Sequence, residues 1–204
     1  MATPSRKLQE LSLFGYKSIR ELRNLRLDPG LNVLIGANGS GKTNFIKFFE
    51  LLGHMMDPSK GLQNYVNQRG RADAFLFRGP KVTPKLRADF KFGVHRYDFI
   101  LHAADDHSLY IAVDLAKDDQ QGHTAVGMLE SVFQRTRAPD EYRWVADTIQ
   151  DWRVYHFHDT TASARVMGLC NIVDNRVLHS DAANLAAFLW RIQQVHPRSL
   201  RPDR

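Results

Sequence analysis

One short segment constrains the fold of this chain more than any other feature. Residues 36–43, GANGSGKT, match the pattern G-x-x-x-x-G-K-[ST] at every fixed position. The apolar run Val33–Ile35 comes directly before it, and apolar side chains recur at intervals of three and four from Lys42 to Met56. The sequence therefore predicts a buried strand, a glycine-rich loop and an amphipathic helix in that order, which is the context of a phosphate-binding loop.

The residue types of this loop suit the binding of a nucleotide. Glycines let backbone N–H groups approach phosphate oxygens, and the N-terminus of the following helix adds partial positive charge. Lys42 can reach the β- and γ-phosphates, and the Thr43 hydroxyl can bind Mg²⁺. ATP and Mg²⁺ are therefore the predicted cofactors, against the alternative of a glycine-rich turn that binds nothing. The predicted nucleotide-binding residues are Gly36, Ala37, Asn38, Gly39, Ser40, Gly41, Lys42, Thr43 and Asn44, with Thr43 as the metal ligand.

Apolar periods divide the rest of the chain into short strands and helices. The predicted strands lie within 8–35 and at 86–92, 97–101, 109–113 and 152–157, and the predicted helices at 42–56, 62–68, 139–151 and from Ser180 or Asp181 to Val195. The three strands between 86 and 113 alternate apolar and polar residues, which is typical of an antiparallel meander. The sequence thus predicts an α/β fold in one domain, 1–204, with a parallel phosphate-loop core in 8–60, an antiparallel β-subdomain in 84–115 and a return to the core in 139–197.

Charge and cysteine content limit the partners and the cellular compartment expected for this chain. Lys and Arg number 28 against 22 Asp and Glu, so the net charge of +6 permits a polyanionic partner without requiring one. The segment Arg69–Lys91 has seven Lys and Arg against two Asp, which indicates either a DNA-contacting patch or the solvated face of a β-subdomain. A lone cysteine, Cys170, excludes an internal disulfide, and no apolar run has the length of a membrane span or a signal peptide. A cytoplasmic protein without a membrane partner is expected.

ATP hydrolysis needs an acidic residue at the end of a buried strand, and the sequence offers no clear one. The pair Asp140-Glu141 follows Arg-Ala-Pro instead of an apolar strand. Asp114 ends an apolar run but lies in the predicted meander, so it is interpreted as an ordinary strand residue. His156 and His158, beside Asp159, have a spacing that could bind a divalent metal, although a structural role is favoured because no third ligand complements them.

Several stretches also resemble a known family. Residues 14–19 (FGYKSI) and 31–44 (LNVLIGANGSGKTN) resemble the N-terminus of RecF/SMC-like ABC-type ATPases. Residues 70–80, 152–159 and 181–189 are similar to one branch of that class, the bacterial AAA-type predicted ATPases. By analogy with ABC-type heads, Tyr16 and Lys17 are candidates for the adenine or ribose end of the site and Gln68 for sensing the γ-phosphate. A surface aromatic–basic pair and a loop glutamine are the competing interpretations.

The resemblance implies a head-to-head dimer with ATP held between two subunits. In that family the C-terminal half supplies a signature sequence, a Walker B Asp-Glu pair and a switch histidine, and this sequence has none of the three. We therefore expect the Walker A half of such an ATPase, truncated or completed by another polypeptide, whose hydrolysis of ATP requires the absent half. The alternatives are a nucleotide-gated DNA-binding or assembly module without turnover, and a non-functional fragment.

Overall fold

The computed structural model describes residues 7–134, 136–155, 161 and 164–195. Backbone contacts divide the chain into two compact units, Met1–Trp152 and Arg153–Arg204. The first unit holds a sheet and the helices that cover it, and the second holds two helices among its described residues. Each unit is described by itself below.

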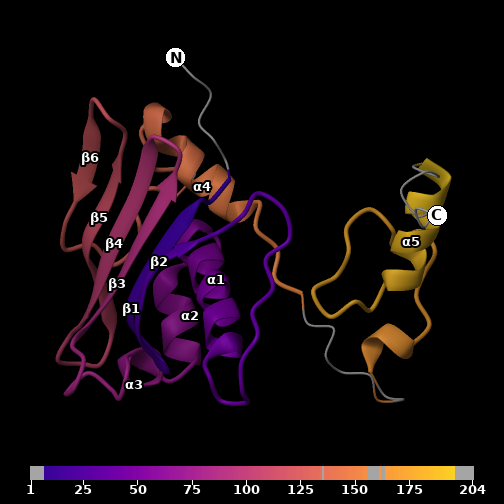
Figure 1. The fold of residues 1–204 in the computed structure, drawn as a ribbon, viewed down its shortest axis with the longest axis horizontal. Coiled ribbons are helices and arrows are strands. Elements are labelled where there is room, and N and C mark those ends of the chain that lie inside the picture. The colour runs from indigo at the N-terminus through magenta and orange to yellow at the C-terminus, as the bar shows by residue number, and fades with distance from the viewer. Residues whose placement is uncertain (1–6, 135, 156–160, 162–163, 196–204) are drawn as a thin grey trace. The chain divides into compact units, whose positions relative to one another are not determined.

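The first unit is built on a six-stranded sheet with the order β2-β1-β3-β4-β5-β6 (Figure 1). Every pair of neighbouring strands is antiparallel. The strands are β1 (Glu10–Tyr16), β2 (Ile19–Arg26), β3 (Lys85–Phe92), β4 (His95–Ala103), β5 (Leu109–Lys117) and β6 (Gly122–Ala125). The predicted meander is confirmed in β3, β4 and β5, whereas the short strand β6 was not predicted.

The helices of this unit lie on one face of the sheet (Figure 1). They are α1 (Lys42–Met56), α2 (Leu62–Gln68), α3 (Arg71–Phe75), the 3-10 helix η1 (Asp140–Tyr142) and α4 (Arg143–Gln150). The predictions of α1 and α2 are confirmed, and the helix predicted at 139–151 is present as η1 followed by α4. The short helix α3 was not predicted.

Alternation along the strands places the core between the sheet and the helices. In β3 the side chains of Leu86, Ala88, Phe90 and Phe92 are buried, while the intervening Lys85, Arg87 and Lys91 are exposed. Because successive side chains of a strand point to opposite faces, one face of the sheet is apolar and the other carries charge. Helix α1 contributes its own buried stripe to the apolar side, with Phe45, Phe48, Leu51, Leu52, Met55 and Met56.

The parallel core predicted around the glycine-rich loop is not found in the described part of the chain. Val33–Ile35 forms no strand there, and Val33 and Ile35 are 68% and 92% exposed. An apolar run adopts a strand only where another strand satisfies its backbone groups, and none of the described strands pairs with it. In addition, β1 pairs with β3, so the first strands belong to the same antiparallel sheet as the meander. The α/β character and the antiparallel sheet are confirmed.

The second unit contains the 3-10 helix η2 (Arg165–Met167) and α5 (Leu185–Val195). Asn184 organises the approach to α5: its Oδ1 accepts from the His179 N–H at 2.9 Å, and its Nδ2 donates to the Asp174 and Val177 carbonyls at 2.8 and 2.9 Å. The last predicted helix is confirmed, although it begins at Leu185, later than expected. The strand predicted at 152–157 is absent from 152–155, and its remaining residues lie outside the described ones.

A buried carboxylate ties the loop after β6 to the sheet. Asp114 is fully buried in β5 and accepts hydrogen bonds from Tyr97 Oη at 2.9 Å, Ser131 Oγ at 2.7 Å and the Val132 N–H at 2.9 Å. Burial raises the pKa of this carboxyl, and the three donors oppose that rise. Asp114 is therefore a strand residue with a structural role, as the sequence predicted.

We expect the substitution Asp114→Ala to lower the free energy of unfolding by about 1–3 kcal/mol or more, because it leaves buried donors without an acceptor. Urea denaturation followed by tryptophan fluorescence measures this. Asp105→Ala, at an exposed turn position, is the matched control and should stay within about 0.5 kcal/mol of the unsubstituted protein. Equal midpoints for the two variants would contradict the role of Asp114.

Candidate functional site

The glycine-rich loop, residues 36–43, runs into the first turn of α1; residues 36–40 are exposed, and Gly41 and Lys42 are partly buried. Its last glycine, Gly41, occupies the N-cap position of α1 with φ 97°, in the left-handed region where side chains other than glycine are strained. A Cβ atom at Gly41 would also lie 3.1 Å from Ser18 Oγ. The loop conformation therefore depends on glycine at this position for two separate reasons.

The N-terminus of α1 is available to a ligand. No side chain among the described residues caps it, and its first turn contains no acidic residue. The first internal hydrogen bond runs from the Phe45 N–H to the Gly41 carbonyl at 2.8 Å. Because the amides before Phe45 have no intrahelical acceptor, they leave partial positive charge at the mouth of the loop, where an anion is stabilised.

Lys42 folds back across the glycine-rich loop. Its Nζ donates to the carbonyls of Gly36 and Ala37 at 2.7 and 2.8 Å and reaches Ser40 Oγ at 3.4 Å. Among the described residues, the ammonium group is therefore held by groups that carry no full charge. A phosphate entering the loop would offer it charge-assisted hydrogen bonds, which are stronger.

A contact that the sequence did not predict holds the loop to the sheet. Asn44 Nδ2 donates to Ser18 Oγ at 2.8 Å, and Ser18 lies in the turn between β1 and β2. Thr43, the predicted metal ligand, is exposed in the first turn of α1 beside this contact. The only signal for Ser18 in the sequence was its place within residues 14–19, the stretch that carries the family resemblance.

Neither interpretation of Tyr16, as a candidate for the adenine or ribose end of the site or as half of a surface pair, fits the structure. Its side chain is fully buried, with its ring 5.4 Å from that of Phe48 and 6.5 Å from that of Phe75. The hydroxyl has no hydrogen-bond partner among the described residues, and burial raises its pKa. Lys17 is partly buried, with Nζ 4.9 Å from the centre of the Phe75 ring, and desolvation lowers its pKa.

Among the described residues, no hydrogen bond or ion pair joins the other sequence candidates to the loop. Gln68 is exposed at the end of α2. Asp140 and Glu141 lie in η1, and Asp114 is committed to the buried cluster described above. His156, His158 and Asp159 lie outside the described residues, among which no metal-binding cluster of His, Cys, Asp or Glu occurs.

Comparison with known families assigns the class of the chain. Residues 31–199 match the family described as "AAA domain, putative AbiEii toxin, Type IV TA system". The chain is also similar to DNA replication and repair protein RecF of Paenarthrobacter aurescens, with 34% identity over 80 residues, and of Cronobacter sakazakii, with 42% identity over 65 residues. These alignments cover 37% and 31% of this chain.

The chain therefore belongs to this AAA domain family, a bacterial P-loop ATPase group of the RecF/ABC-like class. The aligned part spans about a fifth of the length of the RecF relatives, 20% and 18% of the two named above. Among the described residues, none of the helices has both the length and the apolar character needed to cross a membrane.

We expect Gly41→Ala to distort the loop, because an L side chain at a left-handed position costs roughly 1–2 kcal/mol. The variant should unfold at lower urea and bind a fluorescent ATP analogue less tightly. Gly53→Ala is the matched control within α1: no atom lies within 4 Å of its Cβ position. In a helix interior this change should stabilise the protein by about 0.5–1 kcal/mol. Unchanged ATP affinity in Gly41→Ala would contradict the dependence on glycine.

Proposed function

We propose that this chain binds ATP and Mg²⁺ as the Walker A half of a RecF/SMC-like ATPase. The observation that carries the proposal is the uncapped N-terminus of α1 with Lys42 folded over the loop in front of it. In this assignment Lys42 binds the β- and γ-phosphates, the loop amides bind the remaining phosphate oxygens, and the Thr43 hydroxyl ligates Mg²⁺. The bound Mg²⁺ would neutralise phosphate charge.

We propose further that hydrolysis requires groups from outside the described residues. Asp114 is buried and accepts three hydrogen bonds, and Asp140 is paired with Arg143, so neither carboxylate is directed to the loop. In the proposed arrangement another subunit or polypeptide supplies the acidic residue and the signature sequence, so that ATP lies between two protein surfaces.

The segment before the loop supports a partner of this kind. Leu31, Val33 and Ile35 are 88%, 68% and 92% exposed. Among the described residues, the backbone N–H and C=O groups of residues 31–35 form no hydrogen bond. The side chain of Asn32 bonds to the backbone of Asp28 and Gly30. A β-capable run with apolar side chains and free backbone groups is a template for strand pairing. We therefore propose that this run pairs with a strand of the completing polypeptide.

Lys42→Ala should weaken ATP binding by about tenfold to 150-fold, because it removes charge-assisted hydrogen bonds worth roughly 1.5–3 kcal/mol. Titration with a fluorescent ATP analogue in the presence of Mg²⁺ measures the affinity. Lys47→Ala is the matched control, since Lys47 is exposed on the same helix and its loss changes the net charge equally. An affinity for Lys42→Ala equal to that of the control would refute the assignment.

ATP turnover should rise by roughly 10²-fold or more when the product of the adjacent downstream reading frame is added, because single charge-stabilising groups are worth that much in catalysis. Phosphate release is measured for each protein alone and for the mixture. A mixture containing Lys42→Ala should return to the background rate. Equal turnover by this chain alone and by the mixture would contradict the proposed division of the site. ATP binding without turnover, both by this chain alone and by the mixture, would favour a nucleotide-gated module.

A further inference from the structure

A second concave surface lies on the charged side of the sheet, beside the end of β1. It has a volume of about 630 Å³, within the range of roughly 300–1,000 Å³ that is typical of ligand pockets. We call it the basic pocket; its lining residues are Phe14, Gly15, Arg20, Phe77, Arg78, Val82, Thr83, Pro84, Lys85 and Arg87. None of these residues belongs to the glycine-rich loop.

The charge of the basic pocket is of one sign. Arg20, Arg78, Lys85 and Arg87 line it, and no carboxylate does. Arg20, Arg78 and Lys85 form no ion pair with any described residue, and all three are exposed. Arg87 is paired with Asp89 at 2.7 Å, yet 55% of its side chain stays exposed. Unpaired cations converging on a concave surface favour a polyanionic ligand.

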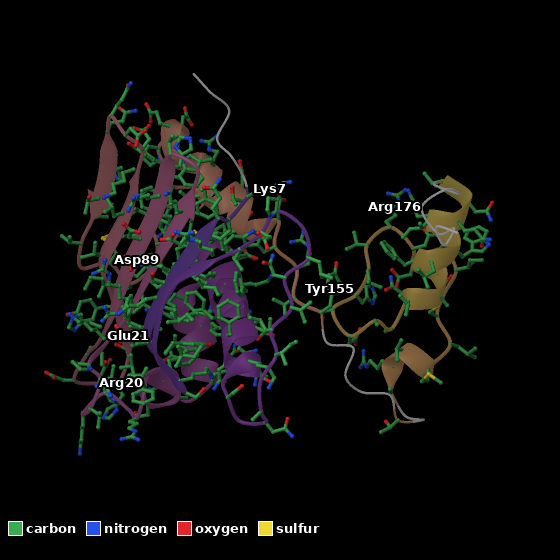
Figure 2. The ribbon with its side chains drawn as sticks, viewed as in Figure 1. Lys7, Arg20, Glu21, Asp89, Tyr155 and Arg176 are labelled. Carbon is green, nitrogen blue, oxygen red and sulfur yellow. The ribbon has the colours of Figure 1, made fainter. Side chains whose placement is uncertain are left out.

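The acidic residue next to Arg20 in the sequence, Glu21, does not neutralise the positive charge of the pocket. Glu21 is paired with Arg23, so its charge is already compensated. Figure 2 shows Arg20 and Glu21 near one end of the sheet and Asp89 farther along it. Neither Glu21 nor Asp89 therefore leaves an unpaired carboxylate in the lining of the pocket.

Two partly exposed aromatic rings accompany the cations. Phe14 on β1 lies opposite Arg87 on β3, and the Arg78 guanidinium lies 5.4 Å from the centre of the Phe77 ring. Aromatic faces stack with nucleobases, while arginine and lysine bind the phosphates between them. The pairing of both types in one hollow is typical of proteins that bind single-stranded nucleic acid.

Close backbone packing at Gly15 forms the floor of the basic pocket without a ligand. At Gly15, φ is 74°, and a Cβ atom there would lie 2.4 Å from the Lys85 carbonyl oxygen. The Phe77 N–H donates to the Gly15 carbonyl at 3.0 Å, which joins the second wall to β1. Gly15 therefore joins β1 to the segment at Phe77 and to the start of β3. The backbone contacts hold Arg78 and Lys85 at the pocket before a ligand binds.

The neighbouring hollow on the same sheet face differs in charge. It has a volume of about 280 Å³ and is lined by four basic residues but also by the carboxylates of Glu10, Asp89 and Asp98. Burial raises the pKa of Asp98, and Lys117, Arg87 and Arg96 oppose that rise. Cations there are compensated by acids, so a polyanion has no reason to prefer it. This hollow therefore supplies a control for the basic pocket.

We infer that the basic pocket binds single-stranded nucleic acid, with Arg20, Arg78 and Lys85 on its phosphates and the Phe14 and Phe77 rings against its bases. This inference is independent of ATP binding, since the two sites share no residue. In this arrangement the nucleic acid lies across the ends of β1 and β3, and Arg20 contacts it from β2.

The test measures fluorescence anisotropy of a labelled oligothymidine strand on the full chain, without nucleotide. Arg20→Gln/Lys85→Gln should lower affinity about tenfold or more, and should reduce the slope of log affinity against log salt by about 1.4, since each phosphate contact contributes about 0.7 for a single strand. Lys91→Gln/Arg96→Gln removes the same charge from the neighbouring hollow and should change affinity less than about twofold. Equal losses in the two variants would overturn the inference.

Two further arms identify the ligand. Phe77→Leu keeps an apolar side chain without the aromatic face and should weaken binding roughly fivefold or more, because base stacking contributes about 1–3 kcal/mol. A duplex of the same length should bind less tightly than the strand. Tighter binding of the duplex, or displacement of the strand by millimolar inorganic phosphate, would overturn the assignment to single strands, as would an unchanged affinity in Phe77→Leu. Each outcome is distinct from a failure of ATP binding, which no arm requires.

Discussion

Packing of Phe48 against the apolar face of the sheet fixes where α1 lies, and the glycine-rich loop depends on α1. The Phe48 ring lies 5.4 Å from that of Tyr16, 6.0 Å from that of Phe90 and 6.3 Å from that of Phe99, and all four side chains are buried. Aromatic contacts of this kind stabilise beyond the area they bury. They set the direction of the helix axis, and therefore the point at which its first amides emerge.

The N-termini of α1 and α2 differ in whether an internal anion accepts their free amides. At α2 the Glu130 carboxylate accepts from the Leu62 N–H at 2.7 Å and the Gln63 N–H at 3.0 Å, so an internal anion satisfies the helix. At α1 no internal anion does so among the described residues. The fold thus provides a carboxylate for one helix start and leaves the other, which carries Lys42, for an external anion.

The sequence predicted the elements whose signal is local. Helix α1 was predicted with its observed bounds because its apolar period and the preceding glycines agree, and the β3–β5 meander follows from strict alternation. Val33–Ile35 was predicted wrongly, because strand propensity says nothing about whether a partner strand is present. Both interpretations of Tyr16 failed for a related reason: its burial depends on Phe48 and Phe75, from two other elements.

The basic residues show why a linear segment could not define the second site. Within Arg69–Lys91 the guanidinium of Arg69 stacks 4.1 Å from the Tyr65 ring centre, and Arg71 donates to the Asp106 carbonyl, so these two cations lie away from the pocket. Arg20, which does line it, comes from outside the segment.

The turn between β1 and β2 then relates the two sites. Ser18 contacts Asn44 of α1, and Arg20 follows two residues later on β2. The alternation of strand side chains sends Ile19 toward the core side, where it lies near the Gly41 position, and Arg20 to the charged side. One hairpin turn therefore supports the glycine-rich loop on one face and the basic pocket on the other. Because the register of β1 with both β2 and β3 holds this turn in place, the two sites keep a fixed separation at the same end of the sheet.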